Sequence, residues 1–189
     1  MTLHDEIQSL LQAPAMNVDD VRTLLRLDHE EALQVARDMV DAEDGEARRA
    51  LLRQLRPALV TLIEAEQREV YAPLRQLRGT DTLRDIASVR LAEQQMLETA
   101  LAWLAKSRKS GSDEWRTQAL ALLRLLERHV GAEHRELFGA LGEHFDDSAL
   151  TAMGRRFLAA KTQIAGRSGN RTNADHERGS VGMAACNSD

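Results

Sequence analysis

Histidine and glutamate side chains interrupt apolar stripes that repeat with the period of an α-helix. Each of them stands three or four residues from a leucine, valine, alanine or methionine on the same helix face. These side chains are His29, Glu66, Glu93, His129 and Glu133. A polar group on such a face needs a hydrogen bond, an opposite charge or a metal ion when the helix packs. The five residues are therefore candidate metal ligands.

Imidazole and carboxylate groups are common ligands of metal ions in proteins. Glu66, Glu93 and Glu133 cannot all stay ionised and unpaired in a protein interior, because desolvating each ion is costly, and no lysine or arginine lies on these stripes. Two divalent cations with a bridging hydroxide would bring the cluster close to neutrality. Two simpler explanations stay open: a buried histidine with only a hydrogen bond, and a hydrated carboxylate at the end of a bundle.

Helices are the elements that would carry these residues. Hydrophobic residues make up 43% of the 189-residue chain and aromatic residues only 3%, which favours an all-α fold with an aliphatic core. Capping residues and glycine turns divide the chain into predicted helices, with Asn17 as the first N-cap and Pro57 and Pro73 kinking or splitting the second helix. The predicted helices span about 18–42, 46–78, 81–106, 112–145 and 147–165.

An internal repeat relates these helices in pairs. Residues 65–74 and 132–141 share five identities, and residues 26–33 align with 90–97. A doubled helical hairpin with short turns predicts an up-down-up-down four-helix bundle over residues 17–165, with a short extra C-terminal helix. Residues 1–16 are an N-terminal extension with room for a short helix. Residues 166–189, which contain the single cysteine Cys186, are predicted to form a disordered tail.

Charge and hydropathy exclude several classes of partner. The chain has 25 Lys and Arg against 30 Asp and Glu, without a long basic run, which argues against nucleic-acid binding. The first residues do not form a signal peptide, and no window approaches a membrane-spanning length of apolar residues. One cysteine permits no intrachain disulfide. We expect a soluble cytoplasmic protein with no nucleic-acid or membrane partner.

Several motifs of the chain resemble those of the hemerythrin-like, or HHE cation-binding, family. They are His29, the pair His129 and Glu133 at HxxxE spacing, and the spacings Glu66…Tyr71…Leu74 and Glu133…Phe138…Leu141. The resemblance covers about residues 18–161. It implies a four-helix bundle around a non-haem di-iron centre. Its ligands are a histidine on the first helix, HxxxE on the second, a histidine on the third and HxxxE on the fourth.

The chain departs from this pattern at two positions. Leu62 stands where the resemblance implies the second-helix histidine, and leucine cannot bind a metal. Glu93 stands where it implies the third-helix histidine, with Gln94 in its place if the register slips by one residue. Glutamate can ligate iron or manganese, as in ferritin-like centres. The predicted metal ligands are thus His29, Glu66, Glu93, His129 and Glu133.

These observations predict a small protein that binds non-haem iron, with two ions expected. By the same resemblance it would interact with oxygen, nitric oxide or peroxide as a sensor, scavenger or store. The alternative is a metal-free bundle that acts as a regulatory or protein-interaction module, as Leu62 indicates. A di-metal oxidase is a third, weaker possibility. His134 and His144 are expected to be a surface and a structural residue, and Tyr71 a core residue able to hydrogen-bond toward the site.

Overall fold

The computed structural model describes residues 19–183, with side chains described for residues 19–167. The described part of the chain is all-helical, with five helical stretches and no strand, which confirms the predicted all-α class and the predicted number of helices. The first, third and fifth stretches are α2 (Val21–Asp41), α5 (Asp81–Lys106) and α8 (Asp147–Met183). The second runs through α3 (Gly45–Glu66), the π-helical turn η1 (Gln67–Tyr71) and α4 (Ala72–Gln76). The fourth runs through α6 (Asp113–Ala132), the π-helical turn η2 (Glu133–Leu137) and α7 (Phe138–His144).

Local capping explains where these helices begin. The Asp20 carboxylate accepts a hydrogen bond from the backbone N–H of Arg22 at 2.8 Å, and Asp44 and Ser112 cap α3 and α6 in the same way. Gly79 lies in the turn before α5 with φ 79°, a conformation that glycine adopts without strain. The predicted cap Asn17 and the N-terminal extension lie outside the described residues.

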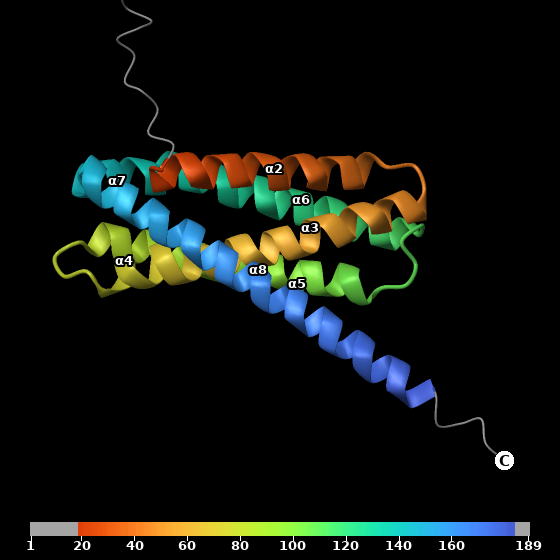
Figure 1. Ribbon diagram of the computed structural model, residues 1–189. Helices are drawn as coiled ribbons and strands as arrows, with labels where there is room; N and C mark the ends of the chain where they lie inside the picture. Colours follow the sequence, from red (N-terminus) through yellow and green to blue (C-terminus); the bar gives the residue numbers. More distant parts are fainter. Residues whose placement is uncertain (1–18, 184–189) are drawn as a thin grey trace, which may run out of the picture.

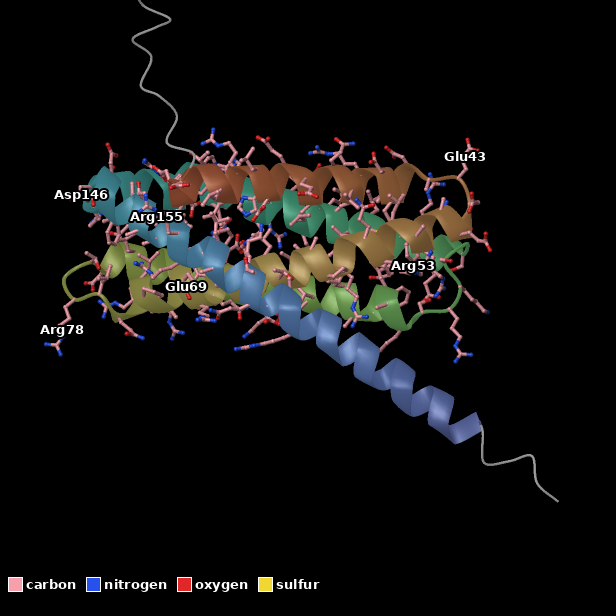
Figure 2. The ribbon with its side chains drawn as sticks, in the orientation of Figure 1. Glu43, Arg53, Glu69, Arg78, Asp146 and Arg155 are labelled. Atoms are coloured by element: carbon pink, nitrogen blue, oxygen red, sulfur yellow. The ribbon has the colours of Figure 1, made fainter. Side chains whose placement is uncertain are left out.

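Four helical stretches lie lengthwise beside one another (Figure 1). α2 packs on α3 and α6, and α5 packs on α6 and α4. Their inner faces form a core of aliphatic residues in which Trp115 and Tyr71 are also fully buried. Charged side chains such as Arg78 and Glu43 point away from the helices (Figure 2). No helix in the described part of the chain combines the length and the apolar character that crossing a membrane requires.

α8 crosses α3 diagonally and packs on both α2 and α3 (Figure 1). It buries Leu150, Met153, Phe157, Ala160 and Ile164, which recur at three- and four-residue steps. The helix continues to Met183, past residue 165 where the sequence predicts its end, and it projects beyond the other helices. Residues 184–189, with Cys186, lie outside the described residues.

The buried face of α5 differs from the predicted one. Val89 and Met96 stand four residues before and three residues after Glu93, on the face that the sequence predicts to point inward. In the structure they are 51% and 44% exposed. The face that is buried instead carries Leu83, Ala87, Arg90, Gln94, Leu97, Leu101 and Leu104. Both faces of α5 carry apolar residues at helical spacing, so periodicity alone could not separate them.

Candidate metal centre

Three ligand groups from separate helical stretches meet in the core. His29 comes from the middle of α2, Glu66 from the last residue of α3 and Glu133 from the first residue of η2. The His29 Nε2 atom lies 2.9 Å from Glu66 Oε1 and 3.0 Å from Glu133 Oε2. One ligand atom from each residue lies within 4.8 Å of the others, and all three residues are buried. One nitrogen therefore faces two carboxylates, a geometry that suits a shared cation.

His129 extends this group along α6. Its Nε2 atom lies 3.8 Å from Glu133 Oε2, and its Nδ1 atom lies 3.1 Å from Glu93 Oε2. Glu93 stays at the margin, with 15% of its side chain exposed, and also pairs with Arg90 at 2.9 Å. Arg90 is buried, which corrects the expectation that no basic residue lies on the inner faces. The structure thus brings His29, Glu66, Glu133 and His129 together and places Glu93 behind His129.

Of the two alternatives on the third long helix, Gln94 faces the centre. Its side chain is fully buried, and its Nε2 donates a hydrogen bond to Glu66 Oε2 at 2.5 Å. Glu93 and Gln94 are neighbours in sequence, so a rotation of α5 by one residue exchanges them. The structure selects Gln94, whose amide oxygen is a weaker metal ligand than the carboxylate that the sequence predicted.

Two residues outside the predicted ligand set contact the centre. The Tyr71 hydroxyl donates a hydrogen bond to Glu133 Oε1, as the sequence allowed. His134, expected at the surface, is half-buried, and its Nε2 lies 3.4 Å from His29 Nδ1. The surface prediction assumed a regular α-helix from residue 129 to 134, whereas η2 begins at Glu133 and has more residues per turn. The prediction that His134 lies at the surface is therefore wrong.

A π-helical turn begins at or beside each of the two central glutamates. In η1 the Ala72 N–H donates to the Gln67 carbonyl, and in η2 the Phe138 N–H donates to the Glu133 carbonyl, both over five residues. These turns fall in the two repeated segments, residues 65–74 and 132–141. Single π-helical turns inside α-helices are frequent at functional sites. The repeat was visible in the sequence, but its backbone conformation was not.

The centre is electrostatically strained without a cation. Burial by itself lowers the pKa of His29, but the nearby Glu133 and Glu66 carboxylates outweigh burial and raise that pKa to about 10. Burial and the neighbouring Glu133 raise the pKa of Glu66 above its ordinary value. The hydrogen bond from His129 lowers the pKa of Glu93. In the absence of a metal ion, a proton on His29 therefore offsets part of the negative charge.

Three buried polar atoms of the centre lack a well-aligned hydrogen bond, although one of them, Glu133 Oε2, lies 3.0 Å from His29 Nε2. They are His129 Nε2, Glu133 Oε2 and Gln94 Oε1. Glu133 Oε2 and Gln94 Oε1 carry lone pairs, and so does His129 Nε2 when the Nδ1 proton is donated to Glu93. A buried lone pair without a hydrogen bond is costly, and a metal ion beside His129 and Glu133 would satisfy the lone pairs of these two residues. The residues present therefore fit a cation.

The centre has more ligand groups for one metal ion than for a second. His29, Glu66 and Glu133 could hold one metal ion, and His129 with the shared Glu133 could contribute part of a second position. Leu62 is buried one helical turn before Glu66, and its side chain has no atom that can bind a metal ion. It lines a cavity of about 500 Å³ between α2, α3 and α8, together with Ala32 and Lys161.

Compared with protein-family models, with curated proteins and with solved structures, the chain matches none of them. Motif spacing alone therefore carries the resemblance to hemerythrin-like proteins. A proposed function for this chain therefore depends on the geometry of the centre.

Proposed function

We propose that this protein binds non-haem iron in the centre formed by His29, Glu66, Glu133 and His129. One observation carries the proposal: three buried ligand atoms of His29, Glu66 and Glu133 converge within 4.8 Å, beside the unpartnered Nε2 of His129. The proposal includes the hemerythrin-like, up-down-up-down arrangement of the four long helical stretches and a cytoplasmic location. The first metal position is the complete one, and a second ion would share Glu133.

The surrounding residues would hold these ligands in place. Glu93 accepts the Nδ1 proton of His129 and so directs the Nε2 lone pair inward. Tyr71 and Gln94 donate hydrogen bonds to Glu133 and Glu66, which orients the carboxylates. The aliphatic core excludes water from the site. These contacts favour a preorganised metal site over a loose cluster of charges.

Bound iron with an open coordination position would supply reversible binding of a small molecule such as oxygen, nitric oxide or peroxide. The cavity beside Leu62 supports this part of the proposal, because it gives small apolar molecules space one helical turn from Glu66. The protein would then act as a sensor, scavenger or store of such a molecule.

Two departures from the hemerythrin-like pattern support a second candidate function, a metal-free bundle that acts as an interaction module. Leu62 removes one ligand expected from the hemerythrin-like pattern, and Gln94 puts an amide where a histidine is expected. Gln94 and Tyr71 also partly satisfy the carboxylates without a metal. In this case protonated His29 would neutralise the centre.

Metal analysis of the full chain, expressed with added iron, separates the two candidates. We expect about one metal equivalent or more per chain and an iron–ligand absorption spectrum, and less than about 0.2 equivalents would favour the metal-free bundle. Glu133→Gln should lower metal affinity at least about tenfold. Glu143→Gln, at an exposed residue of α7 in the same helical stretch, is the matched control and should bind as the unsubstituted protein does.

A further inference from the structure

α5 presents a second apolar face, which points to solvent. Val89, Met96 and Trp103 stand seven residues apart and are 51%, 44% and 36% exposed. They are three of the five large hydrophobic residues that are exposed in the described part of the chain. The chain therefore leaves one helix face with apolar side chains that its own core does not use.

The middle of this face, from residue 88 to residue 103, carries no exposed charged residue. The exposed residues of α5 from 88 to 103 are Ser88, Val89, Ala92, Gln95, Met96, Thr99, Ala102 and Trp103. Charged residues make up 29% of the chain, and the exposed face of α2 carries many of them. Depletion of charge together with exposed Met and Trp is typical of the centre of a protein interface.

Two rows with seven-residue spacing form this face. One row is Thr82, Val89, Met96 and Trp103, and the other is Asp85, Ala92, Thr99 and Lys106. All eight residues are exposed. Such paired rows form the contact seam when two helices pack along their length, as in coiled coils. The occupant that fits this face is thus another helix of similar length.

The ends of the seam carry opposite charges. Asp85 lies at the N-terminal end and Lys106 at the C-terminal end, and neither has an ion-pair partner among the described residues of its own chain. The basic residues Arg108 and Lys109 follow Lys106 in the next loop. The seam is therefore acidic at one end, basic at the other and uncharged between them.

We infer that a second copy of this chain packs on this face, with the two α5 helices antiparallel. Asp85 lies ten residues before Gln95, and Lys106 lies ten residues after Met96. A two-fold axis between Gln95 and Met96 therefore sets Asp85 level with Lys106 of the partner subunit. The same axis sets Trp103 against Ser88 of the partner subunit, a small residue that leaves room for the indole.

The charges favour the antiparallel arrangement over the parallel one. A parallel pair would place Asp85 beside Asp85 of the partner subunit, and like charges across an interface are unfavourable. The antiparallel pair makes the same Asp–Lys contact twice, as a two-fold interface requires. The face is thus complementary to itself, which favours a second copy over an unrelated partner.

Sedimentation equilibrium of the full chain tests the association. Between about 1 and 300 µM we expect the mean mass to rise from 21.1 kDa toward twice that value. Met96→Glu should weaken the association at least about tenfold. Leu27→Glu, at an apolar residue of α2 that is 55% exposed, is the matched control and should not weaken it. Circular dichroism of each variant checks that the helices are intact.

A charge exchange tests the orientation. Asp85→Lys and Lys106→Asp should each weaken the dimer several-fold, and the double variant should recover the affinity to within about threefold of the original. A protein that stays monomeric throughout the range would overturn the proposal. So would equal weakening by Leu27→Glu and Met96→Glu, or a double variant that does not recover.

Discussion

The two nitrogens of His129 have different surroundings, as those of a metal-binding imidazole would. Nδ1 faces the Glu93 carboxylate at 3.1 Å, whereas Nε2 is buried without a hydrogen-bond partner. A metal-binding imidazole commonly has this environment, with a carboxylate that fixes the tautomer on one side and the ion on the other. Glu93 would then position His129 without ligating the metal itself.

Replacing Glu93 should test this role. We expect Glu93→Gln to weaken metal binding by about 10–100-fold, because the amide no longer favours the Nδ1–H tautomer of His129, while the metal ligands remain in place. Glu98→Gln on the same helix is the control. Titration of each metal-free variant with Fe(II) gives the affinities. An unchanged affinity in Glu93→Gln would show that His129 does not depend on this carboxylate.

A substitution at Leu62 should strengthen metal binding at the same centre. Leu62→His would place an imidazole four residues before Glu66 on the same helix face, as in the HxxxE pattern. We expect metal affinity to rise at least about tenfold. We expect the metal-free protein to lose about 1–3 kcal/mol of stability, because a polar ring replaces a buried leucine.

Thermal unfolding of Leu62→His with and without iron measures both effects. The melting temperature should rise with iron and fall without it. A variant that is destabilised under both conditions, with unchanged metal content, would show that residue 62 belongs to the ordinary core.

At the scale of helices, a glycine sets how closely α8 approaches the start of α2. A Cβ atom added to Gly154 would lie 1.9 Å from the Asp19 carbonyl oxygen, so the two backbones would have to separate. Gly166 lies in the same helix, and a Cβ there meets nothing within 4 Å. The two glycines therefore form a matched pair for substitution.

We expect Gly154→Ala to lower the free energy of unfolding by about 1–3 kcal/mol through this clash. Gly166→Ala should raise it by up to about 1 kcal/mol, because alanine is the better helix former. Urea unfolding followed by circular dichroism measures both. Equal effects of the two substitutions would contradict the close approach of α8 to α2.

The buried charges affect the stability of the whole molecule. The folded state raises the pKa of His29 from 6.5 to about 10, so it holds a proton that the unfolded chain releases above pH 6.5. This contribution is fully present below pH 6.5 and is lost as the pH rises toward about 10. The raised pKa of Glu66 acts in the same direction.

We therefore expect the metal-free protein to lose up to about 1.4 kcal/mol of stability per pH unit in this range. Urea unfolding after chelation, at pH values from 6 to 9, measures the loss. The His29→Gln variant should show a smaller pH dependence. A metal-free protein with equal stability at both ends of the range would contradict the raised pKa of His29.

Local features of the sequence determined the number of helices, most of their ends and four of the inward polar residues. Capping by Asp44 and Ser112 and the turn at Gly79 act within a few residues, so they can be recognised without the fold. His29 and Glu66 were predictable in the same way, because each interrupts a helix face with only one apolar stripe.

The tertiary structure alone decided which face of α5 is buried. That helix has two apolar faces, and the packing of α5 on α6 and α4 selects the one with Arg90 and Gln94. The choice turns Glu93 to the margin and exposes Met96. The π-helical turns and the contact of His134 with His29 likewise depend on how whole helices pack. Periodicity reports which residues share a face, but only contacts between helices determine where that face points.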